Sequence, residues 1–270
     1  MQFRCSHVVA SVVIAISLTA CGAIAADPNG SMMSLRSDFG IPLKRSQDID
    51  YGINVANEHY YFYKPANYTG REPFGLMVYV PPIDDMQGLP GGWDAVLAQR
   101  KLLCLIPQRA GNDTMQNRRM GLAILGALAV MHSYNVNPRR VYAAGLSGGA
   151  RTACDMGFYQ SDLFRGTIQD CGADYYRPVT ARYATSQTDT AGYPYGKIDV
   201  DPNDVAAAKS KVRFTLITGS GDFRHGNLLD IYSDGFQRDG FQARLFDVNG
   251  MGHQDCSPQT LTQALDFIER

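Results

Sequence analysis

The chain has 270 residues, of which 45% are hydrophobic, and its formal net charge is −1 at pH 7. A chain of this length and composition can bury a sizeable core inside one globular domain of α/β size. The near-zero net charge and the lack of any run of basic residues give no electrostatic reason to expect a nucleic acid as a partner. We therefore expect no nucleic-acid partner.

The first 20 residues are typical of an export signal. Arg4 lies in the short polar start of the chain, and the apolar run from Val8 to Ala20 has the length of a signal-peptide core. This run is too short to cross a bilayer as a helix. We therefore expect residues 1–20 to be a signal peptide and the protein to be exported.

The sequence contains two alternative cleavage sites. The end of the apolar run, Leu18-Thr19-Ala20-Cys21, resembles a bacterial lipobox, in which Cys21 becomes the lipidated first residue of the mature chain and attaches it to a membrane. A cut after Ala25 would release a soluble periplasmic or secreted protein instead. We favour the lipoprotein, with residues 21–45 as a flexible tether and residues 46–270 as one domain.

Beyond residue 50 the sequence alternates short apolar runs with segments of helical spacing. The first half predicts strands at 60–63, 75–80 and 102–107, and helices at 93–99 and 118–134. The aromatic strand 60–63 and strand 75–80 are separated by turn-forming residues. We therefore expect these two strands to form a hairpin.

A glycine-flanked serine follows the next predicted strand. Gly145-Leu146-Ser147-Gly148-Gly149 lies between an apolar run that begins at Arg140 and the start of a helix, which is the context that a nucleophile elbow requires. Ser147 must then occupy a tight turn with a strained backbone, and side chains at Gly145 or Gly149 would collide across it. We expect Ser147 to be a catalytic nucleophile.

The second half continues the alternation. It predicts strands at 164–169, 212–218 and 243–248, and helices at 152–159, 204–211, 228–239 and 258–269. Such a pattern implies an α/β fold, with helices on both faces of a mainly parallel sheet.

A tyrosine-rich segment, 174–201, interrupts this alternation. It is too long for a simple connection, so we interpret it as a lid or substrate-binding loop, with an irregular surface segment as the alternative. Aromatic rings in such a loop can stack on sugar or aromatic groups, and the candidates are Tyr175, Tyr176, Tyr183, Tyr193 and Tyr195.

Ser147, Asp222 and His253 each follow the carboxyl end of a predicted strand. Ligands of open parallel sheets bind at that edge, so the three loops can converge there. The chain order Ser, Asp, His is the one that α/β-hydrolases use. His253 would accept the proton of Ser147, while Asp222 holds the imidazole and stabilises its charged form.

Other residues compete for these roles. His225 lies so close to Asp222 in the chain that it cannot easily approach the nucleophile from the opposite side, and His59 and His132 precede the elbow. Asp170, at the end of the preceding strand, is the alternative acid. No group of His, Cys and carboxylates has the spacing of metal ligands, so we expect no metal and no cofactor.

An oxyanion hole needs two backbone N–H donors. Gly148 follows the nucleophile at a helix N-terminus and would supply one of them. The other should come from the loop after Val80. Because Pro81 and Pro82 carry no N–H, Ile83 is the first available donor.

The cysteines that remain after export are Cys104, Cys154, Cys171 and Cys256. An oxidising compartment favours disulfides, and four cysteines allow three pairings. We favour Cys154 with Cys171, because the helix after the elbow packs back along the next strand. Four buried free thiols are the alternative.

Besides the elbow, characteristic stretches recur at 61–80, 92–97, 109–112, 137–142 and 172–176. Together they resemble secreted bacterial α/β-hydrolases related to polyhydroxybutyrate depolymerases and to feruloyl and acetylxylan esterases. The resemblance covers residues 55 to 268 and implies hydrolysis of carboxylic esters. Many relatives carry His-Gly after the third strand, where this chain has Pro81-Pro82.

These features predict an exported serine esterase that works through an acyl-enzyme. Its substrates would be small-molecule esters with short acyl groups or esters linked to plant polysaccharides. A serine peptidase on the same fold is one alternative. A surface lipoprotein that keeps the fold only for binding is the other.

Overall fold

The computed structural model describes residues 30–34, 52–54, 57–184 and 198–270. Its strands are β1 (Ser31–Ser34), β2 (His59–Tyr63), β3 (Phe74–Val80), β4 (Leu102–Pro107), β5 (Val136–Leu146), β6 (Gly166–Asp170), β7 (Arg213–Gly221) and β8 (Ala243–Gly252). Its helices are α1 (Trp93–Gln99), α2 (Gln116–Ser133), α3 (Gly148–Tyr159), α4 (Pro202–Lys211), α5 (His225–Asp230), the π-helical η3 (Ile231–Gln237) and α6 (Pro258–Ile268). The predicted signal peptide, Cys21 and the alternative cut after Ala25 lie outside the described residues.

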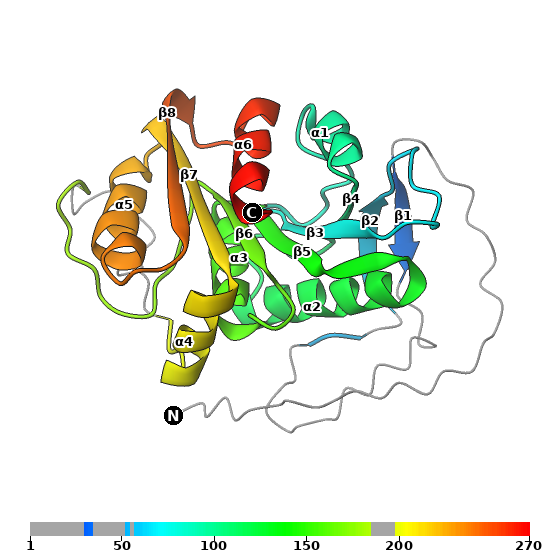
Figure 1. The fold of residues 1–270 in the computed structure, drawn as a ribbon, viewed down its shortest axis with the longest axis horizontal. Coiled ribbons are helices and arrows are strands. Elements are labelled where there is room, and N and C mark those ends of the chain that lie inside the picture. The colour runs from blue at the N-terminus through cyan, green and yellow to red at the C-terminus, as the bar shows by residue number, and fades with distance from the viewer. Residues whose placement is uncertain (1–29, 35–51, 55–56, 185–197) are drawn as a thin grey trace.

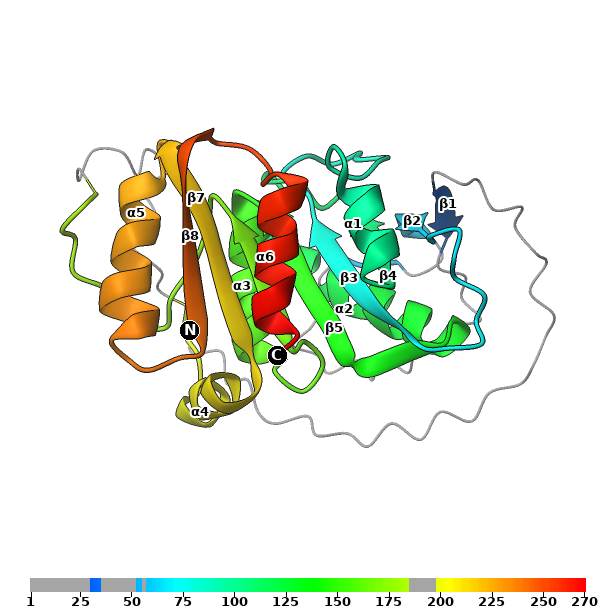
Figure 2. The ribbon, with the colours of Figure 1, turned by 45° about the horizontal axis from the view of Figure 1, so that its top comes forward.

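The strands form one sheet in the order β1-β2-β4-β3-β5-β6-β7-β8. From β4 to β8 neighbouring strands run parallel, whereas β1 and β2 pair antiparallel at one edge. Helices α1 and α6 cover one face, and α2, α3 and α4 lie on the other (Figures 1 and 2). The predicted α/β architecture is confirmed.

The central strands are buried on both faces, as the strands of parallel sheets usually are. In β3, Met77 and Tyr79 belong to the core under α1 and α6, while Leu76 and Val78 belong to the core under α2 and α3. This alternation follows from the two-residue period of a strand. The apolar run of β3 is continuous because both faces of the strand are buried.

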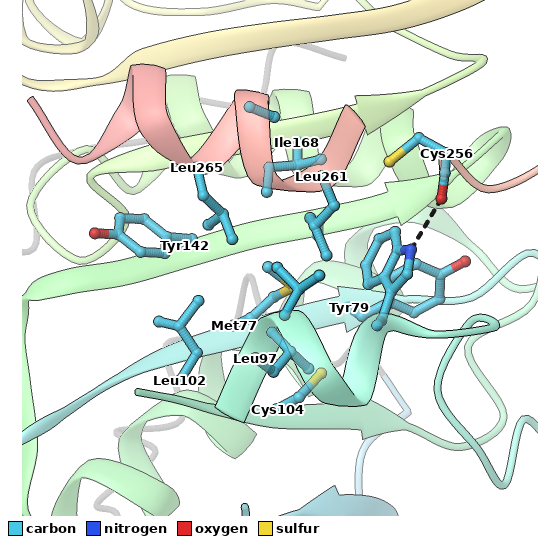
Figure 3. Close-up of a cluster of buried hydrophobic side chains, with 14 of the residues drawn as sticks. Met77, Tyr79, Leu97, Leu102, Cys104, Tyr142, Ile168, Cys256, Leu261 and Leu265 are labelled. Carbon is cyan, nitrogen blue, oxygen red and sulfur yellow. Dashed lines mark hydrogen bonds between the residues drawn. The ribbon is translucent and has the colours of Figure 1, made fainter. Parts of the chain in front are cut away.

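Figure 3 shows the core under α1 and α6, where Leu97, Leu261 and Leu265 close over the sheet. Trp93, the first residue of α1, is fully buried there. Its Nε1–H donates to the carbonyl oxygen of Cys256 at 2.9 Å, the bond drawn in Figure 3. Because Cys256 lies just before α6, this hydrogen bond ties together the two helices on that face.

The predicted hairpin of strands 60–63 and 75–80 is wrong. β2 pairs with β1 and β4, and β3 lies between β4 and β5. The segment that connects them packs against the residues that follow α2. The ring of Tyr68 lies edge-on to Phe74 with centroids 5.0 Å apart, and its hydroxyl accepts a hydrogen bond from the Asn135 amide at 2.7 Å. The segment therefore crosses to the end of α2 and does not turn back along the sheet.

Two further elements differ from the sequence predictions. Ser31–Ser34 lie inside the predicted tether but form the edge strand β1 against β2, and the other residues of 21–45 fall outside the described part, apart from Gly30. The helix predicted at 228–239 is α5 followed by the π-helical η3. Among the described residues, no helix is both long enough and apolar enough to cross a membrane.

The contact between Trp93 and Cys256 gives a test of this core. Trp93→Phe leaves a buried carbonyl without its donor and a gap beside Tyr79, so the free energy of unfolding should fall by about 2–4 kcal/mol. Urea unfolding followed by circular dichroism measures this loss. The control is Tyr183→Phe, at a side chain that is 58% exposed, which should change stability by less than about 0.5 kcal/mol. Equal stability of the two variants would contradict the assignment.

Candidate active site

Ser147 lies on the sharp turn between β5 and α3. Its backbone has φ 59° and ψ −119°, a conformation that costs a residue with a side chain about 1–3 kcal/mol. The flanking glycines allow this turn, because a Cβ on Gly145 would lie 2.5 Å from the carbonyl carbon of Gly149, and one on Gly149 would collide with the Val80 carbonyl oxygen. The predicted strand-turn-helix context of Ser147 is present.

Asp222 and His253 are brought together by the register of β7 and β8. The last residue pair of these parallel strands is Gly221 with Gly252. Asp222 directly follows Gly221, and His253 directly follows Gly252. Nδ1 of His253 lies 2.8 Å from Oδ1 of Asp222. The two strands thus place an imidazole and a carboxylate in hydrogen-bond contact at the carboxyl edge of the sheet.

The carboxylate of Asp222 is held in its charged form. Its side chain is fully buried, which alone would raise its pKa, but hydrogen bonds from His253, the Arg224 amide and the Thr218 hydroxyl outweigh the burial and lower the pKa below its usual range. A charged carboxylate beside Nδ1 favours the imidazole tautomer that carries its proton on Nδ1. Nε2 of His253 is then available to accept a proton.

The competing residues are engaged elsewhere. Nε2 of His225 lies 2.9 Å from Oδ1 of Asp247, and His59 contacts the hydroxyl of Ser34 at 2.9 Å on the β1 edge. His132 is exposed on α2. Asp170 is fully buried and accepts from the amide of Cys256 at 3.0 Å, and its burial raises its pKa far above the ordinary carboxyl value. A carboxyl group whose charged form is disfavoured does not suit the role of the triad acid.

Two loops and the start of α3 meet around Gly148. The loop after β3 is fastened to residues 109–112, with the Asn112 amide donating to the Pro82 carbonyl at 3.0 Å and the Gly111 amide to Asp84 Oδ1 at 2.8 Å. A Cβ on Gly148 would collide with Oδ1 of Asn112. The sequence did not single out Asp84, and it marked Asn112 only as a member of the characteristic stretch 109–112.

The backbone donors predicted for an oxyanion hole lie in this region. Gly148 is the first residue of α3, so its N–H has no acceptor inside the helix. Within the described residues the amide of Ile83 has no hydrogen-bond acceptor, and the Ile83 side chain is exposed. Both amides are therefore free to bind an anionic oxygen.

The predicted disulfide between Cys154 and Cys171 is absent, and all four described cysteines are buried free thiols. The two side chains lie in different cores: Cys154 packs under α4 and α5 and donates to the Asp174 carbonyl at 3.1 Å, whereas Cys171 belongs to the core under α1 and α6. The sheet separates these cores. A helix that packs back along the next strand does not bring these two sulfurs to one face.

Cys171 instead lies beside the acid and the histidine. Sγ of Cys171, a carboxylate oxygen of Asp222 and a ring nitrogen of His253 all lie within 4.8 Å of one another. Burial, with the negative charge of Asp222 adding to it, raises the pKa of the Cys171 thiol far above its ordinary value. These contacts were missed because nothing in the sequence distinguishes Cys171 from the other cysteines.

Phe223 is a second residue that the sequence did not reveal. Its ring stacks on the imidazole of His253 with centroids 4.2 Å apart and planes 30° from parallel. The ring is 51% exposed, so it shields one side of the imidazole and presents its other side outward. The only available signal was its position directly after Asp222.

The described part of the predicted lid is anchored to the domain. Tyr175 is fully buried, and its hydroxyl and that of Tyr176 donate to Asp239 Oδ2 at 2.8 and 2.7 Å. Stacking of Tyr175 on a substrate is therefore excluded, whereas Tyr183 is exposed. Tyr193 and Tyr195 lie outside the described residues.

A separate hollow of about 420 Å³ lies at the opposite edge of the sheet. It is lined by residues near the amino ends of β5, β6 and β7 and by the end of α6: Arg139, Arg140, Tyr142, Arg165, Lys211, Arg213, Ile268, Glu269 and Arg270. None of the residues predicted for catalysis faces it. Chemistry at Ser147 belongs to the carboxyl edge.

Known structures share this fold at low sequence identity. A ferulic acid esterase is 15% identical, with a TM-score of 0.57 over 78% of this chain and 91% of its own. The acetyl xylan esterase from Aspergillus awamori is 14% identical, with a TM-score of 0.53 over 82% and 97%. Dipeptidyl peptidase 4 from Porphyromonas gingivalis is 14% identical, with a TM-score of 0.56 over 78% of this chain but 33% of its own.

No protein-family model and no curated protein matches the sequence. At identities of 14–15% the structural likeness shows the fold alone. The chain therefore has the α/β-hydrolase fold. The resemblance to polyhydroxybutyrate depolymerases remains a prediction.

The close approach at the elbow predicts the effect of one methyl group. Gly149→Ala must push α3 away from the Val80 carbonyl, and we expect it to lower the free energy of unfolding by about 2–3 kcal/mol or more. Gly88→Ala is the matched control, because a Cβ there meets no atom within 4 Å, and it should cost less than about 0.5 kcal/mol. Thermal and urea unfolding compare the two. A Gly149→Ala variant as stable as the control would refute the observed packing.

Proposed function

We propose that this protein, with its α/β-hydrolase fold, is a serine esterase in which Ser147, His253 and Asp222 form the catalytic triad. The observation that carries the proposal is the 2.8 Å contact between His253 and Asp222 at the sheet edge where β5 ends in the turn bearing Ser147. A buried, charged carboxylate oriented on an imidazole is the arrangement that general-base catalysis needs.

The proposed reaction has two halves. Oγ of Ser147 attacks the ester carbonyl carbon while its proton passes to Nε2 of His253. The tetrahedral intermediate collapses, the C–O bond to the alcohol breaks, and His253 returns the proton to the leaving alcohol. Water then attacks the acyl-enzyme with His253 again as the base, which releases the acid and restores Ser147. Asp222 stays charged throughout and stabilises the imidazolium.

The amides of Gly148 and Ile83 are proposed to bind the oxyanion. Support comes from their lack of acceptors in the described part of the chain and from the hydrogen bonds that hold the loop after β3 to residues 109–112. Preorganised donors of this kind stabilise the charge that develops in the transition state without having to reorient.

A peptidase on this fold is the second candidate, since dipeptidyl peptidase 4 shares the fold, but this chain spans only a third of that protein. We propose short-chain or polysaccharide-linked carboxylic esters as substrates. Export is also a proposal, resting on residues 1–20, as is attachment to a membrane through a lipid on Cys21.

Hydrolysis of p-nitrophenyl acetate, butyrate and octanoate tests the proposed activity. Ser147→Ala and His253→Ala should each lower kcat by at least about 10³-fold with the fold retained, while His225→Ala, the matched histidine control, should stay within about threefold of the original chain. A dipeptidyl p-nitroanilide tests the peptidase alternative. Absence of turnover on every substrate would favour the third possibility, a binding protein.

The role of Ile83 has its own test. Ile83→Pro removes the amide proton, whereas Ile83→Ala shortens the exposed side chain and keeps the proton. We expect the proline variant to lose about 10²–10³ in kcat and the alanine variant to lose little. Thermal unfolding checks that both variants fold. Equal activity of the two would remove Ile83 from the oxyanion hole.

A further inference from the structure

We propose that the thiol of Cys171 is a positioning group for His253 and Asp222, holding the loop after β8 beside the acid. This inference rests on the proposed function, because the positioning matters only if His253 is the catalytic base. Cys171 belongs to none of the motifs identified in the sequence.

Cys171 occupies a position equivalent to that of Ser147 on the neighbouring strand. Leu146 of β5 pairs with Asp170 of β6, so the nucleophile and the cysteine are the first residues beyond this pair. Both have a left-handed backbone, with φ 59° and 56°. A positive φ is unfavourable for a residue with a Cβ, so the side chain must gain contacts that a glycine here would lack.

The sulfur makes those contacts on both sides of His253. Sγ of Cys171 lies 3.6 Å from the carbonyl oxygen of Gly252 and 3.5 Å from that of Gln254, the two residues that flank the histidine. Sulfur hydrogen bonds are longer than those of oxygen, and both distances fall within their range. Sγ also lies within 4.8 Å of a carboxylate oxygen of Asp222, and the neighbouring thiol contributes to the low pKa of this acid.

The backbone around Cys171 joins the loops of the site. The Ser147 amide donates to the Asp170 carbonyl at 2.8 Å, and the Cys171 amide donates to the Ile217 carbonyl of β7 at 2.8 Å. A Cβ on Gly172 would collide with the carbonyl oxygen of Ser147. Residues 170–172 therefore contact the nucleophile turn, the strand that carries Asp222 and the loop of His253.

The thiol keeps its proton under all conditions in which the triad would work. It is buried, and the carboxyl groups that face it are Asp222 at the end of β7 and Asp170 at the end of β6. Both oppose a thiolate, so their effect adds to the burial that raises the pKa of Cys171. The group is a constant S–H donor and takes no part in proton transfer.

Removing this donor should change the base more than substrate binding. In Cys171→Ala the Asp222 carboxylate keeps more of its negative charge for the imidazole, so the acidic limb of the kcat/KM profile should move up by about half a pH unit. The freed loop should lower kcat about tenfold, a part of the 10²–10⁴ that a positioned base provides. KM should change less than about threefold.

Two further variants separate positioning from loss of packing. Cys171→Ser keeps a hydrogen-bond donor at the same place. Its kcat should lie within about threefold of that of the unmodified protein, and the acidic limb of its kcat/KM profile should lie within about 0.2 pH units. Cys104→Ala removes an equally buried thiol in β4 and should lower the melting temperature without moving the limb. If all three variants lose activity only in proportion to their stability, Cys171 is a packing residue and the proposal fails.

A readout that needs no turnover keeps the proposal independent of the esterase assay. In a Ser147→Ala background, the ring nitrogens of His253 can be titrated by NMR with and without Cys171→Ala. We expect the titration midpoint to rise by about half a pH unit in the double variant and to stay unchanged with Cys104→Ala. An unchanged midpoint for His253 would overturn the positioning role of Cys171. A lack of ester hydrolysis by the unmodified protein would overturn only the proposed function.

Discussion

The close approach of α3 to the end of β3 is the constraint on which the site depends. Gly149 lies so near the Val80 carbonyl that a Cβ would collide with it, and this contact forces β5 to turn sharply into α3 within one residue. That residue is Ser147, which adopts a positive φ as a result. The same contact brings the loop after β3 against the first amide of α3. One steric requirement thus positions both the nucleophile and the donors proposed to bind the oxyanion.

The parallel sheet supplies the rest of the arrangement. Because β5, β6, β7 and β8 are neighbours and run in one direction, the residues just beyond their ends collect along one edge. In order across the sheet these are Ser147, Cys171, Asp222 and His253, all contributed by different loops. The charge at Asp222 is stabilised by hydrogen bonds despite burial, whereas Asp170 one strand away lacks enough of them and its pKa is raised. Local hydrogen bonding, and not proximity to the edge, distinguishes the two acids.

Local sequence patterns predicted much of this structure. The helical spacing predicted α1 and an apolar run predicted β4, both with the correct ends. The glycines around Ser147 identified the turn, because only a steric requirement explains both of them. Contacts between distant parts of the chain were harder to predict. The partner of β2 depended on how Tyr68 fastens a loop to α2, and the disulfide depended on which face of the sheet each sulfur occupies, which a single sequence does not contain. Phe223 and Cys171 were missed for a related reason: their importance comes from contacts with His253, which lies far away in the chain.

Covalent labelling of Ser147 tests the central claim most directly. The protein would be treated with a fluorophosphonate, the stoichiometry measured by intact mass, the modified peptide identified by tandem mass spectrometry, and the residual hydrolysis of p-nitrophenyl butyrate followed in parallel. The account predicts one label per chain, on Ser147, with activity falling in proportion to labelling. Labelling at another residue, or hydrolysis that persists after Ser147 is fully modified, would contradict it.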